Sequence, residues 1–146
     1  RKPMSMTLNQ AIAERLAEEK SDFDRRLVAF AADMGSHESS WRNPRNFDRV
    51  VDLCLAKMDS AFAIAADEFE DWRRTALNDS QSYRLGCDFV NSVETQLWEI
   101  ERAAADFCLS EKGVRDARIS RKHALLMSAA VATADGSRCD QIALAG

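Results

Sequence analysis

The feature that most constrains the fold is an unbroken helical stripe in the middle of the chain. Apolar residues between positions 47 and 76 follow one another at steps of three or four, which places them on one face of an α-helix of about eight turns. Asn43 and Pro44 precede the stripe and suit the N-cap and first position of a helix. The stripe consists of Phe47, Val51, Cys54, Met58, Phe62, Ala65, Phe69, Trp72 and Ala76.

A second stripe lies before it in the chain. Apolar residues recur at helical spacing from Leu8 to Met34, and only Glu19 places a charge on this face. Gly35 follows directly and is typical of the C-terminal end of a helix. Residues 35–43 show no periodicity, so we expect the longest internal loop there.

Two further helices are predicted after the polar break at residues 78–80. The third helix carries its stripe from Tyr83 to Phe107, and Gly113 marks its end. The fourth begins within the basic segment 115–123 and ends near Asp135–Gly136. Its apolar face contains Ile119, Leu126 and Ala130.

These patterns predict an all-α fold. Helices of nearly 30 residues span about 40–45 Å, and short connections place neighbours antiparallel. We therefore expect an elongated up-down-up-down bundle of about four helices, three of them long, or a helical hairpin completed by a second copy. The chain, 1–146, fits one domain. Residues 1–6 are expected to be disordered or foreign to the native protein, and 137–146 to form an irregular tail.

The stripes also predict which side chains are inside. Phe62, Phe69 and Leu97 occupy stripe positions and are expected to be almost fully buried. The acidic pairs Glu18–Glu19 and Glu68–Glu70 are expected to lie on solvated faces, since unpaired carboxylates are rarely buried.

The composition is that of an ordinary globular protein. Charged residues make up 30% and the net charge is −4, which argues against a general attraction to nucleic acid or membranes. No apolar run approaches the ~20 residues of a membrane helix, and the N-terminus lacks a signal-peptide core. Four distant cysteines without a C-x-x-C pair predict free thiols in a cytoplasmic protein, with no metal and no cofactor.

Basic residues are expected to gather at one end of the bundle. In an up-down topology the loop at 35–43 and the start of the fourth helix share that end. Exposed arginines and aromatic residues are frequent at protein interfaces, although basic helical turns also commonly face only water. The candidate partner-binding residues are Trp41, Arg42, Arg45, Arg49, Arg115, Arg118, Arg121 and Lys122.

Arg118 and His123 form the pattern R-x4-H. This resembles the HEPN family of helical-bundle ribonucleases, whose R-x4–6-H motif acts on RNA across a dimer. The resemblance implies that Arg118 stabilises phosphate charge and that His123 transfers a proton. Two departures are that Ile119 follows the arginine, where the family has a polar residue, and that an offset of five residues separates the two side chains by about 140°.

The sequence therefore predicts a non-enzymatic protein–protein interaction module, such as a regulator, adaptor, chaperone or inhibitor. Its partner is expected to be another protein or a second copy of itself, bound through amphipathic helical faces and the basic end. Trp98, beside the stripe residue Leu97, is a further candidate anchor. The alternatives are a HEPN-like ribonuclease using Arg118 and His123, and a nucleic-acid-binding accessory protein.

Overall fold

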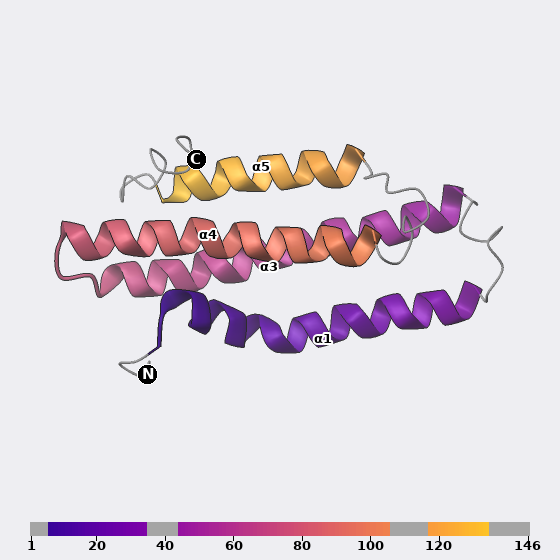
Figure 1. Cartoon of the computed structure of the whole chain (residues 1–146), viewed down its shortest axis with the longest axis horizontal. Coiled ribbons are helices and arrows are strands. Elements are labelled where there is room, and N and C mark those ends of the chain that lie inside the picture. Colours follow the sequence, from indigo (N-terminus) through magenta and orange to yellow (C-terminus); the bar gives the residue numbers. More distant parts are fainter. Residues whose placement is uncertain (1–5, 35–43, 106–116, 135–146) are drawn as a thin grey trace.

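The computed structural model describes residues 6–34, 44–105 and 117–134, which contain four α-helices and no strand. The chain runs back and forth along one axis, so each helix is antiparallel to the one before it (Figure 1). The predicted elongated, all-α, up-down-up-down bundle is confirmed. The helices are α1 (Leu8–Met34), α3 (Pro44–Arg74), α4 (Asp79–Ala104) and α5 (Ala117–Thr133).

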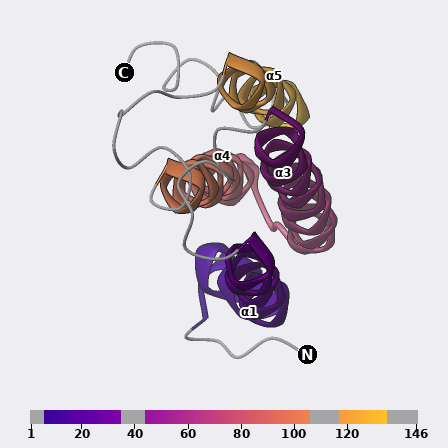
Figure 2. The ribbon, with the colours of Figure 1, turned by 90° about the vertical axis from the view of Figure 1, so that its right-hand side faces the viewer.

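Seen along its axis, the bundle is built around α3 and α4 (Figure 2). α1 lies on one side of this central pair and α5 on the opposite side, and α3 contacts all three other helices. α3 has 31 residues and α5 only 17. The central pair therefore carries two separate interfaces, one with the long α1 and one with the short α5.

Polar side chains fix the starts of two helices. The Thr7 hydroxyl accepts from the backbone N–H of Gln10 at 3.2 Å, and the Gln10 side chain accepts from the Thr7 N–H at 2.8 Å. This reciprocal pair is a capping box. The Asn78 side chain caps α4 by accepting from the Gln81 N–H at 2.9 Å. The polar break predicted at residues 78–80 thus begins a helix.

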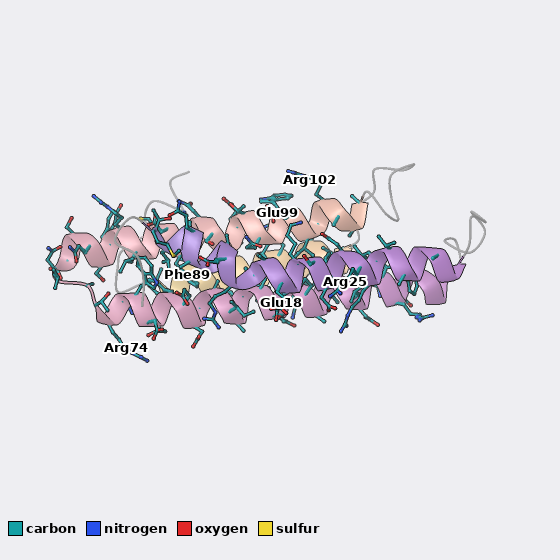
Figure 3. All side chains as sticks on the ribbon, turned by 90° about the horizontal axis from the view of Figure 1, so that it is seen from below. Glu18, Arg25, Arg74, Phe89, Glu99 and Arg102 are labelled. Carbon is teal, nitrogen blue, oxygen red and sulfur yellow. The ribbon has the colours of Figure 1, made fainter. Side chains whose placement is uncertain are left out.

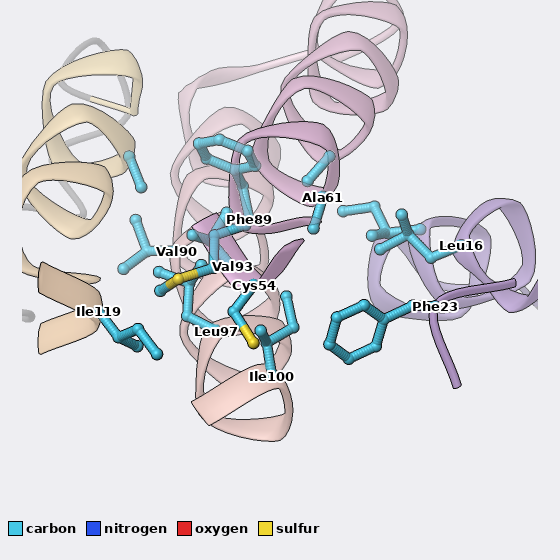
Figure 4. Packing of buried hydrophobic residues seen from close by; sticks show 14 of the residues in the cluster. Leu16, Phe23, Cys54, Ala61, Phe89, Val90, Val93, Leu97, Ile100 and Ile119 are labelled. Atoms are coloured by element: carbon cyan, nitrogen blue, oxygen red, sulfur yellow. The ribbon is translucent and has the colours of Figure 1, made fainter. Parts of the chain in front are cut away.

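The core follows the predicted stripes closely. Phe69 and Leu97 are fully buried, as predicted, and the Phe69 ring stacks on Phe89 with centroids 4.6 Å apart. The prediction for Phe62 was wrong, because this side chain is only partly buried. Ala61 is buried instead. A period of 3.6 residues turns the buried face toward Ala61 and leaves Phe62 on its flank, 6.2 Å from the Phe89 centroid. Figure 4 shows part of this packing around Phe89.

The prediction that Glu68 lies on a solvated face was also wrong. Its side chain is buried, and its two carboxylate oxygens accept from Trp72 Nε1 at 3.0 Å and from Arg15 Nη1 at 3.1 Å. α1 packs over this face of α3 and brings the guanidinium of Arg15, so the buried charge is paired. Glu18 is exposed as predicted. Charged side chains such as Arg74 project outward from the bundle (Figure 3).

Several sequence predictions fall outside the described residues. They concern the N-terminus, the loop at 35–43 with Gly35, the end of the third helical stripe with Phe107 and Gly113, and the tail at 137–146. Within the described part, no helix combines the length and the apolar character needed to cross a membrane.

Candidate functional site

The start of α3 and the start of α5 lie at the same end of the bundle, as the up-down topology requires (Figure 1). Arg49 and Arg118 therefore lie toward this end, whereas Lys122 reaches Asp59 at the middle of α3. Arg121 adjoins Lys122 on α5. Trp41, Arg42 and Arg115 are outside the described residues, and Arg45 belongs to α3 although its side chain is not among those described.

Two of these basic residues bind acidic residues of α3. Arg118 Nη1 lies 2.8 Å from Asp48 Oδ1, and Lys122 Nζ lies 2.8 Å from Asp59 Oδ1. All four side chains are partly exposed. Arg118 and Lys122 are one helical turn apart, so they face α3 together. Their charges connect α5 to α3 within the chain.

The other two basic residues have different surroundings. The Arg49 guanidinium lies over the ring of Phe30, 4.7 Å from its centroid, in a cation–π contact between α3 and α1. Arg121 is exposed and forms no ion pair with another described residue. Among the described residues, Arg121 is thus an exposed basic side chain of α5 that is not used in an ion pair within the chain.

His123 faces α4 and forms a buried polar pair. Its ring Nδ1 donates to a carboxylate oxygen of Glu101, and the side chains are only 12% and 5% exposed. The ring of Trp98 meets the His123 ring edge-on with centroids 4.7 Å apart. His123 thus lies between α4 and α5, where Glu101 satisfies one ring nitrogen.

The structure does not bring Arg118 and His123 together within one chain. Arg118 contacts Asp48 on α3, whereas His123 contacts Glu101 on α4. The five-residue offset explains this, because it turns the two side chains toward different neighbours. The R-x4-H pattern therefore connects α5 to both central helices.

The α1–α3 interface contains polar contacts that the sequence analysis did not anticipate. Glu19, the one charged residue on the first stripe, accepts from Ser60 Oγ at 2.7 Å and lies 3.3 Å from Lys57 Nζ. Further along, Arg15 binds Asp67 at 2.8 Å as well as Glu68, and these hydrogen bonds raise the pKa of its guanidinium. In the sequence, the position of Glu19 on an otherwise apolar stripe was the signal that could have predicted a polar contact at this interface.

A cleft of about 240 Å³ also lies between α1 and α3. Its walls mix the apolar Phe23 and Leu53 with Glu19, Asp22, Arg26 and Lys57. The acidic and basic groups here already pair with one another across or along the helices. Among the described residues, no cluster of three or more histidine, cysteine or acidic side chains is arranged to hold a metal ion.

Comparison of the chain with family models, with curated proteins and with solved structures finds no match. The architecture and the side-chain contacts described above are therefore the basis for any statement about function.

Proposed function

We propose that this chain is a non-enzymatic protein–protein interaction module, acting as a regulator, adaptor, chaperone or inhibitor. The observation that carries the proposal is the environment of Trp98. This large aromatic side chain is 39% exposed on α4, while one edge of its ring is held against His123. An exposed tryptophan with a supported orientation is typical of residues that dominate binding energy at interfaces.

The support beneath Trp98 lowers the cost of binding. His123 is itself held by the buried carboxylate of Glu101, so the ring against which Trp98 packs has a fixed position. A side chain that is already ordered loses less conformational entropy when a partner covers it. Met127 lies one helical turn after His123 and is partly exposed, and its flexible thioether suits a surface that adapts to a partner.

Arg121 adds a positive charge near the start of α5. Its exposed guanidinium is available to an acidic group of a partner, and arginine is enriched at interfaces. A contact of this kind weakens as salt screens it, so added salt should raise the dissociation constant of the complex. The partner is another protein or a second copy of the chain.

The test uses partners that copurify with the full-length chain from its native host, identified by mass spectrometry and then purified. Trp98→Ala should weaken binding about tenfold or more. Val28→Ala is the matched control, because Val28 is also an exposed apolar residue, at 59%, but lies on α1. Equal dissociation constants for wild type and Trp98→Ala would remove Trp98 from the proposal. Loss of binding in Val28→Ala as well would indicate a nonspecific apolar contact.

A further inference from the structure

α5 is attached to the bundle differently from the other helices. Its only large buried apolar side chain among the described residues is Ile119, which is accompanied by the small Ala130 and, just beyond the helix, Ala134. The largest fully buried side chains of the described chain come from α1, α3 and α4, and none from α5. Leu126, Met127 and Val131 of α5 also pack against the core but are only partly buried. Since apolar burial is the main source of helix docking energy, α5 contributes the smallest set of fully buried side chains to its own docking.

Polar contacts make up much of the attachment of α5 to α3. Arg118 and Lys122 bind Asp48 and Asp59 of α3 near the start of α5. At the other end, Arg73 of α3 donates to the backbone carbonyl of Thr133 at 3.1 Å. The two ion pairs are partly exposed, and pairs of this kind contribute little to stability and are screened by salt.

The surface beneath α5 is apolar with an acidic rim. Ile119 points from α5 toward Val93 and Leu97 of α4 (Figure 4). Asp48 and Asp59 of α3 border this surface, whereas Glu101 of α4 is buried beneath α5, where it pairs with His123. The complement of such a surface is a helix with a narrow apolar stripe flanked by basic residues, which is the pattern of α5 itself.

We propose that α5 is a displaceable helix, and that the surface between α3 and α4 beneath it binds a basic amphipathic helix of a partner protein in place of α5. This inference rests on the proposed function and specifies the site and the chemistry of the partner. In the complex the incoming helix takes the place of His123 against the ring of Trp98. In the isolated chain α5 occupies the site. The apparent affinity for a competing helix is therefore its intrinsic affinity multiplied by the fraction of time that the site is free.

The experiment uses the full-length chain and a fluorescein-labelled peptide of residues 117–134 as the probe. In the variant Arg118→Glu/Lys122→Glu, the chain's own α5 is repelled by Asp48 and Asp59, which should free the site. Fluorescence anisotropy should then show the wild-type peptide binding this variant about tenfold more tightly than it binds the wild-type chain. A peptide with the same two charge reversals should not bind more tightly.

Hydrogen exchange provides the second measurement. Amides of α5 should exchange faster in Arg118→Glu/Lys122→Glu than in wild type, while those of α1 and α4 keep their protection. The matched control is Arg25→Glu/Arg26→Glu, two exposed arginines of α1 whose ion pairs with described residues are with Asp22 of the same helix. The control should leave both α5 exchange and peptide binding at wild-type values.

Two results would overturn the proposal. One is unchanged α5 exchange in Arg118→Glu/Lys122→Glu, which would mean that apolar contacts alone hold the helix. The other is a released α5 in Arg118→Glu/Lys122→Glu with no gain in binding of the wild-type peptide.

If circular dichroism shows that this variant is unfolded, Asp48→Asn/Asp59→Asn removes the same pairs from the other side. This second variant should release α5. It should not bind the peptide more tightly, because the peptide's own Arg118 and Lys122 also lose their acidic partners. Retained protection of the α5 amides would again contradict the proposal.

The outcomes of the two proposals can be told apart. If the peptide test fails while Trp98→Ala weakens partner binding, displacement of α5 is rejected and the interaction module is kept.

Discussion

Glu101 on α4 and His123 on α5 join their helices through a hydrogen bond between a carboxylate oxygen and a ring nitrogen, with both side chains almost excluded from water. The contact fixes the rotation of α5 about its own axis, because His123 must face α4 while Arg118 and Lys122 face α3. It also supports the ring of Trp98. One buried polar pair thus connects the docking of α5 with Trp98, the residue proposed to bind a partner.

We expect His123→Ala to lower the free energy of unfolding by about 1–3 kcal/mol, because it leaves the buried Glu101 carboxylate without its donor. Urea denaturation measures the loss. His123→Gln, which can still donate a hydrogen bond, should recover part of it. The double variant Glu101→Leu/His123→Leu should be more stable than His123→Ala, since no unpaired charge remains buried. Equal stability of wild type and His123→Ala would show that the pair contributes nothing.

We expect the two phenylalanines of α3 to differ in their contribution to stability. Phe69→Ala should cost about 3–5 kcal/mol, because its ring is fully buried and stacked on Phe89. Phe62→Ala should cost clearly less, since the ring lies on the flank of the buried face. Urea denaturation of both variants checks the order, and equal costs would contradict the helix rotation described here.

We expect Asp88→Asn to stabilise the fold at neutral pH. Burial raises the pKa of Asp88 above its ordinary value of 3.8, and the neighbouring Arg84 only partly opposes this. The carboxyl group of Asp88 therefore binds its proton more tightly in the native state than in the unfolded state. The stability that this protonation contributes is present at low pH and is lost as pH rises through the raised pKa.

The urea midpoint of Asp88→Asn should consequently exceed that of wild type at pH 7, and the difference should vanish below about pH 3.8. Asp52→Asn, at an exposed carboxylate of α3, is the control for the loss of a surface negative charge. A constant difference across the pH range would assign the effect to something other than titration of Asp88.

The ribonuclease alternative makes a separate prediction. If Arg118 and His123 act on RNA, the purified wild-type chain should cleave RNA without added metal, and His123→Ala should abolish cleavage while the chain stays folded. The proposed interaction module predicts no cleavage by either protein. Gel electrophoresis of a labelled RNA after incubation separates the two, and cleavage that depends on His123 would reject a purely non-enzymatic role.

The sequence by itself determined the helices and their order. The spacing of apolar residues places α1, α3 and α5 within a few residues of their observed positions, and the polar break at residues 78–80 predicted the start of α4. These features depend on neighbours three or four residues apart, so they can be recognised along the chain. Short connections then required antiparallel helices, and this placed the basic residues at one end.

Only the tertiary structure decided which side chains meet. Arg118 and Lys122 were expected to face a partner, yet they contact Asp48 and Asp59 of the same chain. Glu68 was expected to be in water, yet α1 covers it. Such contacts depend on the rotation and axial offset of two packed helices, which are properties of the interface between them. A shift of one residue in 3.6 turns a side chain by about 100°, enough to exchange a buried position for an exposed one.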